Sequence, residues 1–152
     1  GYSLVRYLLN QKKIDAKKNI FLKKELIKPT KIYVNEVLKL IDKNLINGCA
    51  NITGGGLADN IQRVMPDNLT AEINLNLIKT SKIFKWLHRN GVSNTEMLKT
   101  FNCGVGFCLI ISPKKLNKIK GYFTNNFKPY VIGKITKNFK EKVKLNGCVN
   151  WI

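Results

Sequence analysis

The spacing of hydrophobic residues predicts several short amphipathic helices. In residues 4–10 and again in residues 32–44, apolar side chains recur three and four positions apart, as on one face of a helix. This face holds Leu4, Val5, Leu8 and Leu9 in the first helix, and Val34, Val37, Leu38 and Ile41 in the second. Ser3 is in position to cap the first helix. Further helices are predicted over residues 57–65, 82–90, 95–101 and 114–123.

Apolar stretches between and after these helices predict strands over residues 47–53, 69–75, 104–112, 129–137 and 142–152. Residues 69–75 alternate, with Ala71, Ile73 and Leu75 on one face. Residues 104–112 form the most apolar run, as in a strand at the centre of a sheet. The order of elements predicts an α+β fold, with helices packed against one mixed β-sheet.

The length of 152 residues fits one domain with its own core. We expect residues 29–152 to form this domain. Residues 1–10 hold the first helix, and residues 11–28 are interpreted as a lysine-rich, solvated connection with a short helical turn near its end. Because the sequence begins at Gly1 rather than at a methionine, we expect it to be part of a longer protein.

The net charge of +18 is typical of proteins that bind nucleic acid or acidic membrane surfaces. However, only Arg6, Arg63 and Arg89 are arginines, the residue best suited to paired contacts with phosphate and guanine. The lysines are scattered and accompanied by many asparagines and isoleucines, which A/T-rich codons also favour. The composition therefore does not favour nucleic acid as a partner.

Cysteine and histidine positions predict no metal site. The four cysteines include no CxxC pair. Cys103 and Cys108 are expected on opposite faces of one strand, where they could not share a metal ion. His88 is expected to be a solvated residue at a helix end. No stretch approaches the roughly 20 apolar residues of a membrane-spanning helix, so we expect no membrane association and a cytoplasmic protein with reduced thiols.

Three consecutive glycines, Gly54–Gly56, lie between a predicted strand and a predicted helix. Such a turn can hold an anion, because unpaired backbone N–H groups and the positive end of the helix dipole meet there. Glycine would let a phosphate approach the backbone closely. The spacing matches neither GxGxxG nor a P-loop, so an ordinary tight turn is an equally good interpretation.

The stretch "TFNCGVG", residues 100–106, is a second candidate. Asn102 would stand at the mouth of a strand, with Gly104 and Gly106 leaving space beside it. The alternative is structural: a polar residue that ends the preceding helix, and glycines that permit a bulge or close packing. The residues alone favour this structural interpretation.

Taken together, four stretches resemble phosphoribosylformylglycinamidine cyclo-ligases, also called AIR synthetases. They are "PTKIYV" (29–34), "ITGGGLADNIQRVMPDN" (52–68), "EMLKTFNCGVG" (96–106) and "VIGKI" (131–135). The similarity is to the C-terminal half of these enzymes and covers nearly the whole sequence in order. It implies an α/β sandwich, in agreement with the predicted elements. The opening "GYSLVR" resembles the segment that joins the family's two halves, which implies that residues 1–10 contain the end of this inter-domain connection as well as the first helix.

The resemblance also implies an activity. These ligases use ATP and Mg²⁺ to close formylglycinamidine ribonucleotide (FGAM) into aminoimidazole ribonucleotide (AIR), with release of ADP and phosphate. ATP is thought to phosphorylate the formyl oxygen, which then leaves as phosphate when the ring nitrogen attacks. In the family an N-terminal domain supplies much of the ATP and Mg²⁺ site and forms the homodimer. The resemblance therefore implies that the 152 residues are inactive without that domain.

The resemblance assigns roles to particular residues. Thr53, Gly54, Gly55 and Gly56 match the family's glycine-rich loop, which implies contact with a phosphate of FGAM or ATP. Asn102 and Gly104 match the second motif and imply a place near the same cleft. Asn60 and Arg63 match the helix behind the loop, as structural support.

One position departs from the family pattern. Asn51 stands where the family usually has histidine, so an acid, base or cationic role of that side chain is lost. The catalytic residues are therefore not assigned. The alternative to a ligase is a non-catalytic, divergent homologue that acts as a binding or interaction module with a basic surface.

Overall fold

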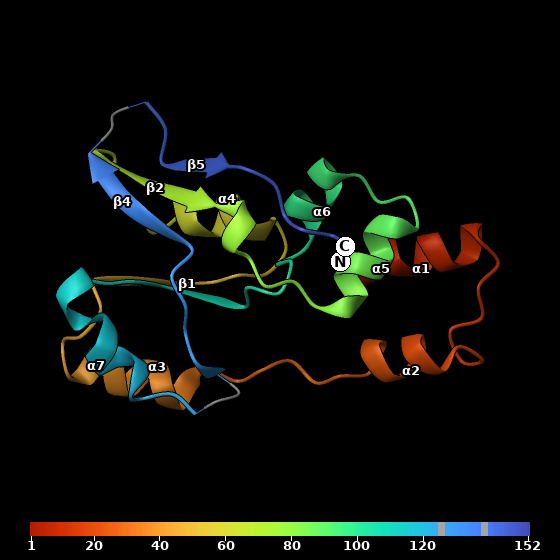
Figure 1. Ribbon diagram of the computed structural model, residues 1–152, viewed down its shortest axis with the longest axis horizontal. Helices are drawn as coiled ribbons and strands as arrows, with labels where there is room; N and C mark the ends of the chain where they lie inside the picture. Colours follow the sequence, from red (N-terminus) through yellow and green to blue (C-terminus); the bar gives the residue numbers. More distant parts are fainter. Residues whose placement is uncertain (125–126, 138–139) are drawn as a thin grey trace.

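The computed structural model describes residues 1–124, 127–137 and 140–152. Its helices are α1 (Tyr2–Gln11), α2 (Ile20–Leu26), α3 (Val34–Asp42), α4 (Gly56–Gln62), α5 (Lys82–Arg89), α6 (Asn94–Thr100) and α7 (Leu116–Lys120). Its strands are β1 (Gly48–Asn51), β2 (Leu69–Asn74), β3 (Phe107–Ile110), β4 (Gly133–Lys137) and β5 (Val143–Asn146). Short 3₁₀ turns, η1 (Leu75–Leu77) and η2 (Pro113–Lys115), follow β2 and precede α7. The α+β class and the order of elements are as predicted (Figure 1).

The described strands form two sheets, where the sequence predicted one. β1 and β3 pair antiparallel, with Asn51 opposite Phe107, while β2 lies between antiparallel β4 and parallel β5. The second sheet is therefore mixed, as expected. The apolar run of residues 104–112 is not a central strand, because β3 pairs with β1 alone in the described part of the chain. Cys108 and Ile110 pack against the main core and Leu109 against a smaller cluster of α3 and α7, and an apolar run cannot reveal these partners.

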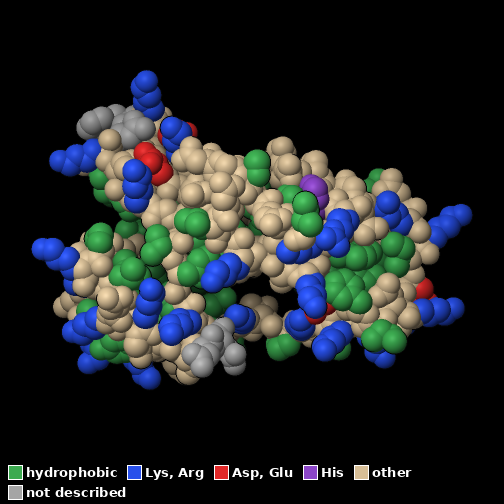
Figure 2. Space-filling model, in the orientation of Figure 1, with side chains coloured by type: hydrophobic (Ala, Val, Ile, Leu, Met, Phe, Trp, Pro, Cys, Tyr) green, Lys and Arg blue, Asp and Glu red, His purple; other side chains and the backbone are tan. Residues whose placement is uncertain are grey.

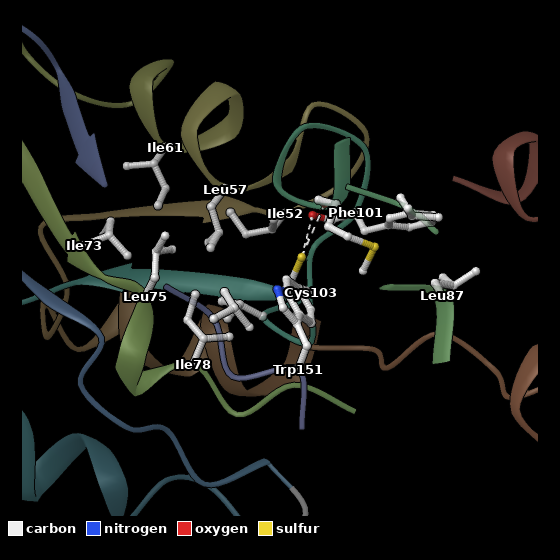
Figure 3. Close-up of a cluster of buried hydrophobic side chains, with 14 of the residues drawn as sticks. Ile52, Leu57, Ile61, Ile73, Leu75, Ile78, Leu87, Phe101, Cys103 and Trp151 are labelled. Carbon is white, nitrogen blue, oxygen red and sulfur yellow. Dashed lines mark hydrogen bonds between the residues drawn. The ribbon is translucent and has the colours of Figure 1, made fainter. Parts of the chain in front are cut away.

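Most buried side chains belong to one hydrophobic core. Figure 3 shows part of it, with Leu57 and Ile61 of α4 above Ile52, and with Ile73 of β2 close by. A smaller cluster of Leu40, Leu45 and Ile119 lies between α3 and α7. Together these clusters hold the ends of β1 and β3 in place between α4 and α6 on one side and α3 and α7 on the other.

The N-terminal helix packs as predicted but starts earlier. Val5 and Leu8 are buried in the main core, with Leu4 and Leu9 packed against it. Ser3 is not the cap, because α1 already begins at Tyr2 with Gly1 at the N-cap and without a side-chain cap. Within residues 11–28, the expected helical turn is α2, capped by the side chain of Asn19.

The exposed side of α3 differs from the prediction. Val37 and Leu40 are buried, whereas Val34, Leu38 and Ile41 are 57%, 52% and 46% exposed. Helix α3 therefore carries apolar residues on two faces, and only the face toward α7 is covered. Periodicity shows that a helix has an apolar stripe, but not which of two adjacent stripes is inside.

The last described residues run over α5 and α6 rather than forming a strand as far as Ile152. The indole Nε1 of Trp151 donates to Asn94 Oδ1 at 2.6 Å, and the His88 ring stacks on Trp151 with 5.1 Å between centroids. His88 is thus a half-buried packing residue, not a solvated one as predicted. Trp151 belongs to the main core although it lies outside the helices and strands, so a helix or strand pattern could not predict its burial.

Within the described residues, no helix is long and apolar enough to cross a membrane. Lysine and arginine side chains lie on several separate parts of the face seen in Figure 2 rather than in one stripe.

Candidate functional site

The glycine-rich loop links β1 to α4 in a tight turn. The N–H of Gly56 donates to the Thr53 carbonyl at 3.2 Å, and Gly55 and Gly56 have φ values of +92° and +67°. Gly54 has no such φ, and a Cβ added there would find no heavy atom within 4 Å. The fold therefore requires glycine at positions 55 and 56, whereas at position 54 the space is open to solvent.

Asn60 fixes the shape of this loop from α4. Its buried side-chain amide donates to the carbonyl of Gly56 at 2.7 Å and to that of Gly54 at 3.2 Å. A longer contact of 3.4 Å joins Thr53 Oγ1 to Asn60 Oδ1. One side chain thus donates hydrogen bonds to two carbonyl groups of the turn and ties the turn to α4.

The fold brings the second motif against the first. The N–H of Ile52, just after β1, donates to the Gly106 carbonyl at 3.0 Å. On the other side of the loop, a Cβ added to Gly56 would overlap the Leu98 carbonyl oxygen and lie 3.3 Å from that of Phe101. The two candidate stretches, far apart in the sequence, are therefore neighbours in space.

Asn102 and Gly104 form a turn that their own atoms stabilise. Asn102 Oδ1 accepts from the Gly104 N–H at 3.0 Å, and the Asn102 carbonyl accepts from the Val105 N–H at 2.8 Å. Gly104 has a φ of +102°, and a Cβ there would lie 2.9 Å from the Lys79 carbonyl. These contacts hold the turn in shape, and whether either residue also contacts a ligand stays a prediction.

The other predicted site residues differ in their relation to the loop. Asn51 is exposed at the end of β1, two positions before Thr53. Arg63 is exposed just after α4, whereas Asn60 contacts the loop directly. Sequence reasoning did not single out Asp59, whose carboxylate lies against Gly55, 2.7 Å from where a Cβ would be. The glycine-rich pattern alone did not indicate that a carboxylate would lie beside the loop.

Cys108 lies in β3 as predicted, but Cys103 is placed differently from the prediction. Cys103 lies before β3 at a φ of +51°, not in the strand, and its thiol faces the carbonyls of Met97 and Phe101. Burial raises the pKa of Cys103 and Cys108 to about 12, so both stay protonated near neutral pH. Among the described residues, no group of three or more His, Cys, Asp or Glu side chains could hold a metal ion.

Sequence comparisons place this chain in a family. A model of the family described as "AIR synthase related protein, C-terminal domain" matches residues 1–146. The chain belongs to this family. The matched residues include the glycine-rich loop and the second motif.

Similar curated proteins include enzymes of purine biosynthesis. The chain is 42% identical to the phosphoribosylformylglycinamidine cyclo-ligase of Vigna unguiculata, named as chloroplastic/mitochondrial, over 89% of its own length. It is 39% identical to that of Streptococcus pneumoniae over 94% of its length, and 43% identical, also over 94%, to the "Bifunctional purine biosynthetic protein purD" of Dictyostelium discoideum. The matched part covers 36% and 43% of the two cyclo-ligases and 19% of the bifunctional protein. The chain therefore spans less than half of these relatives.

Proposed function

We propose that this chain is the C-terminal half of an ATP-dependent cyclo-ligase that converts FGAM to AIR with release of ADP and phosphate. The observation that carries the proposal is the identity of about 40% to named cyclo-ligases over nearly all of the chain. The contact between the two motifs supports it, because a site that needs both would need them side by side.

Within this function, Thr53–Gly56 hold a phosphate group, and Asn102 and Gly104 shape the adjacent wall. The open space beside Gly54 supports this role, since neither backbone conformation nor internal packing requires glycine there. The phosphate binds on the Gly54 side of the loop, because the Asp59 carboxylate at Gly55 would repel it. It belongs either to FGAM or to ATP.

The remaining parts of the reaction require a second domain. An N-terminal domain would supply most of the ATP site and the homodimer contact, and the chain alone would not turn over FGAM. Among the described residues there is no cluster of metal ligands, and this proposal places the Mg²⁺ contacts on the N-terminal domain. A cytoplasmic location stays a prediction.

The test is FGAM-dependent release of ADP by a protein in which this chain is joined to an N-terminal cyclo-ligase domain. We expect Gly54→Val to raise the KM of the phosphate-bearing substrate, while Gly48→Ala, where a Cβ would make only an ordinary contact, leaves it unchanged. Absence of FGAM-dependent ADP release in the unmodified protein would overturn the ligase proposal and favour a non-catalytic binding module.

The effect of the asparagine at position 51 is tested by a separate variant. If the imidazole lost at this position limits the reaction, Asn51→His will raise kcat without changing the unfolding midpoint. An unchanged kcat would show that Asn51 is an adequate replacement and that the position has no acid or base role in this enzyme.

A further inference from the structure

A cavity adjoins the second motif. A cavity of about 620 Å³ opens between β3, β4 and the segment before β4. In Figure 2, hydrophobic side chains line a hollow between the part of the molecule that holds β4 and the part that holds α7. Its volume falls within the range of small-molecule sites, and its interior is mostly apolar. Gly104, Val105 and Gly106 form part of its wall, so the cavity adjoins the second motif.

Aromatic rings are concentrated along this cavity. Its lining includes Tyr33, Phe107, Phe123, Phe127 and Tyr130. The ring of Tyr33 lies 5.4 Å from that of Phe107 and 5.8 Å from that of Phe127, the latter edge-on. A Cβ added to Gly106 would overlap the Tyr33 hydroxyl group. Glycine at position 106 thus makes room for Tyr33, and three contacts fix its ring.

The charged side chains that line the cavity are lysines. Lys31, Lys128 and Lys134 lie along it, and no aspartate or glutamate belongs to the lining among the described residues. The Lys31 Nζ lies 5.3 Å from the centre of the Phe127 ring, and the Lys134 Nζ lies 3.7 Å from Glu72 Oε2. Lys79 lies next to it, with its Nζ 5.0 Å from the centre of the Tyr130 ring. Burial raises the pKa of the Tyr33 phenol, which therefore stays neutral near pH 7. A cationic ligand would be repelled here, whereas an anion would be attracted.

We propose that this cavity binds a nucleotide, with its planar base against the aromatic side chains that line the cavity and a phosphate at Lys31 and Lys128. Flat rings stack on aromatic side chains, and lysines on the rim suit a phosphate. The choice of a purine-related nucleotide rests on the proposed function, because both AIR and ATP carry such a ring and a phosphate. The phosphate at these lysines is separate from the one assigned to Gly54.

Binding of AMP, ADP and AIR to the 152-residue chain, measured by calorimetry, tests the site. Tyr33→Leu should weaken binding of the preferred nucleotide about tenfold through loss of base stacking. Tyr7→Leu, at an exposed tyrosine of α1, is the matched control and should have no effect. Tighter binding of AIR than of AMP and ADP would identify the cavity as a site for the FGAM or AIR nucleotide. Tighter binding of AMP or ADP would identify it as a site for ATP.

The contact between Gly106 and Tyr33 allows a sharper test. Gly106→Ala should weaken binding, because the added Cβ displaces the phenol, and Tyr33→Phe in the same chain should restore part of it by removing the oxygen that overlaps. Lys31→Gln together with Lys128→Gln should weaken nucleotide binding but not adenosine binding. The control Lys118→Gln, on α7 and outside the cavity lining, should change neither.

Equal affinities in Tyr33→Leu and Tyr7→Leu, or no binding of any of the three nucleotides at millimolar concentration, would overturn the proposed cavity site. This failure is distinct from failure of the ligase proposal. A protein joined to its N-terminal domain could still release ADP in response to FGAM with Tyr33 replaced. Conversely, nucleotide binding that depends on Tyr33, without FGAM-dependent ADP release, would support the cavity site and overturn the ligase proposal.

Discussion

The carbonyl oxygen of Leu98 lies against the Cα of Gly56, so that α6 contacts the first turn of α4 where a side chain would not fit. Gly56 also has a φ of +67°, which residues with a Cβ adopt at a cost. This contact holds the two sequence motifs together. Its loss should therefore affect both stability and the shape of the loop.

Gly56→Ala should lower the free energy of unfolding by about 3 kcal/mol, because it combines backbone strain with steric overlap. Gly54→Ala should change it by less than about 0.5 kcal/mol, since the added methyl group meets only solvent. Urea unfolding followed by tryptophan fluorescence measures both. Equal stability of the two variants would contradict the described packing of α4 on α6.

Asn60→Asp should destabilise the chain by about 2 kcal/mol. The substitution replaces the amide that donates to the Gly56 and Gly54 carbonyls by a carboxylate that cannot donate. Asn68→Asp, at an exposed position before β2, is the matched control and should be nearly neutral. Denaturant midpoints above pH 6 compare the two, and similar midpoints would show that the amide does not hold the loop.

Asp59→Asn should strengthen binding of ADP measured without magnesium, if the glycine loop holds a phosphate. Two unit charges about 4 Å apart in water interact with about 1 kcal/mol, which corresponds to a gain of about fivefold. Asp42→Asn, at the exposed end of α3, should have no such effect. An unchanged affinity of Asp59→Asn for both ADP and AIR would place the bound phosphate away from the loop.

The cysteines should react in an order set by burial. A disulfide reagent such as DTNB should modify exposed Cys148 first at pH 8, and reach Cys103 and Cys108 only after unfolding, because their pKa of about 12 leaves almost no thiolate. The variant Cys148→Ser should lose the fast phase. Rapid labelling of Cys103 in the folded protein would contradict its burial.

The same two thiols should lower stability in alkali. Their folded-state pKa lies above the ordinary thiol value of about 8.5, so the folded state keeps protons that the unfolded state loses. The stability that they contribute is complete below about pH 8.5 and decreases as the pH rises toward 12. Urea midpoints between pH 8 and pH 10 should fall less in a variant with both cysteines replaced by alanine.

The sequence predicted the kinds and order of the elements well, because helices and strands have different hydrophobic periods. It could not predict how they pair. Residues 104–112 are as apolar as a central strand, yet β3 has one strand neighbour in the described chain. Thr70 lies on the strand face opposite Ala71 and Ile73, yet it is fully buried, and its hydroxyl donates to the Glu141 carbonyl. Such long-range partners leave no local pattern.

The candidate site was predictable only in part. Local spacing identified the glycine loop but could not decide between a turn and a phosphate site; the family resemblance supplied the phosphate role. Tyr33 was missed as a site residue, although it lies within one of the family-like stretches. Its relation to Gly106 depends on the meeting of segments that lie far apart in the sequence. A tyrosine before a helix carries no signal that a distant glycine makes room for it.

The pairing of β2 also has a consequence for synthesis on the ribosome. Both of its neighbours, β4 and β5, emerge only after α5, α6, β3 and α7 have been made. Until then the nascent chain exposes the backbone edges of β2 and the apolar side chains of Ala71 and Ile73, which the finished fold buries. Non-local and parallel pairing of this kind is slow to form. The three-stranded sheet is therefore among the last parts to assemble, and a chain interrupted before β4 is a species prone to aggregate.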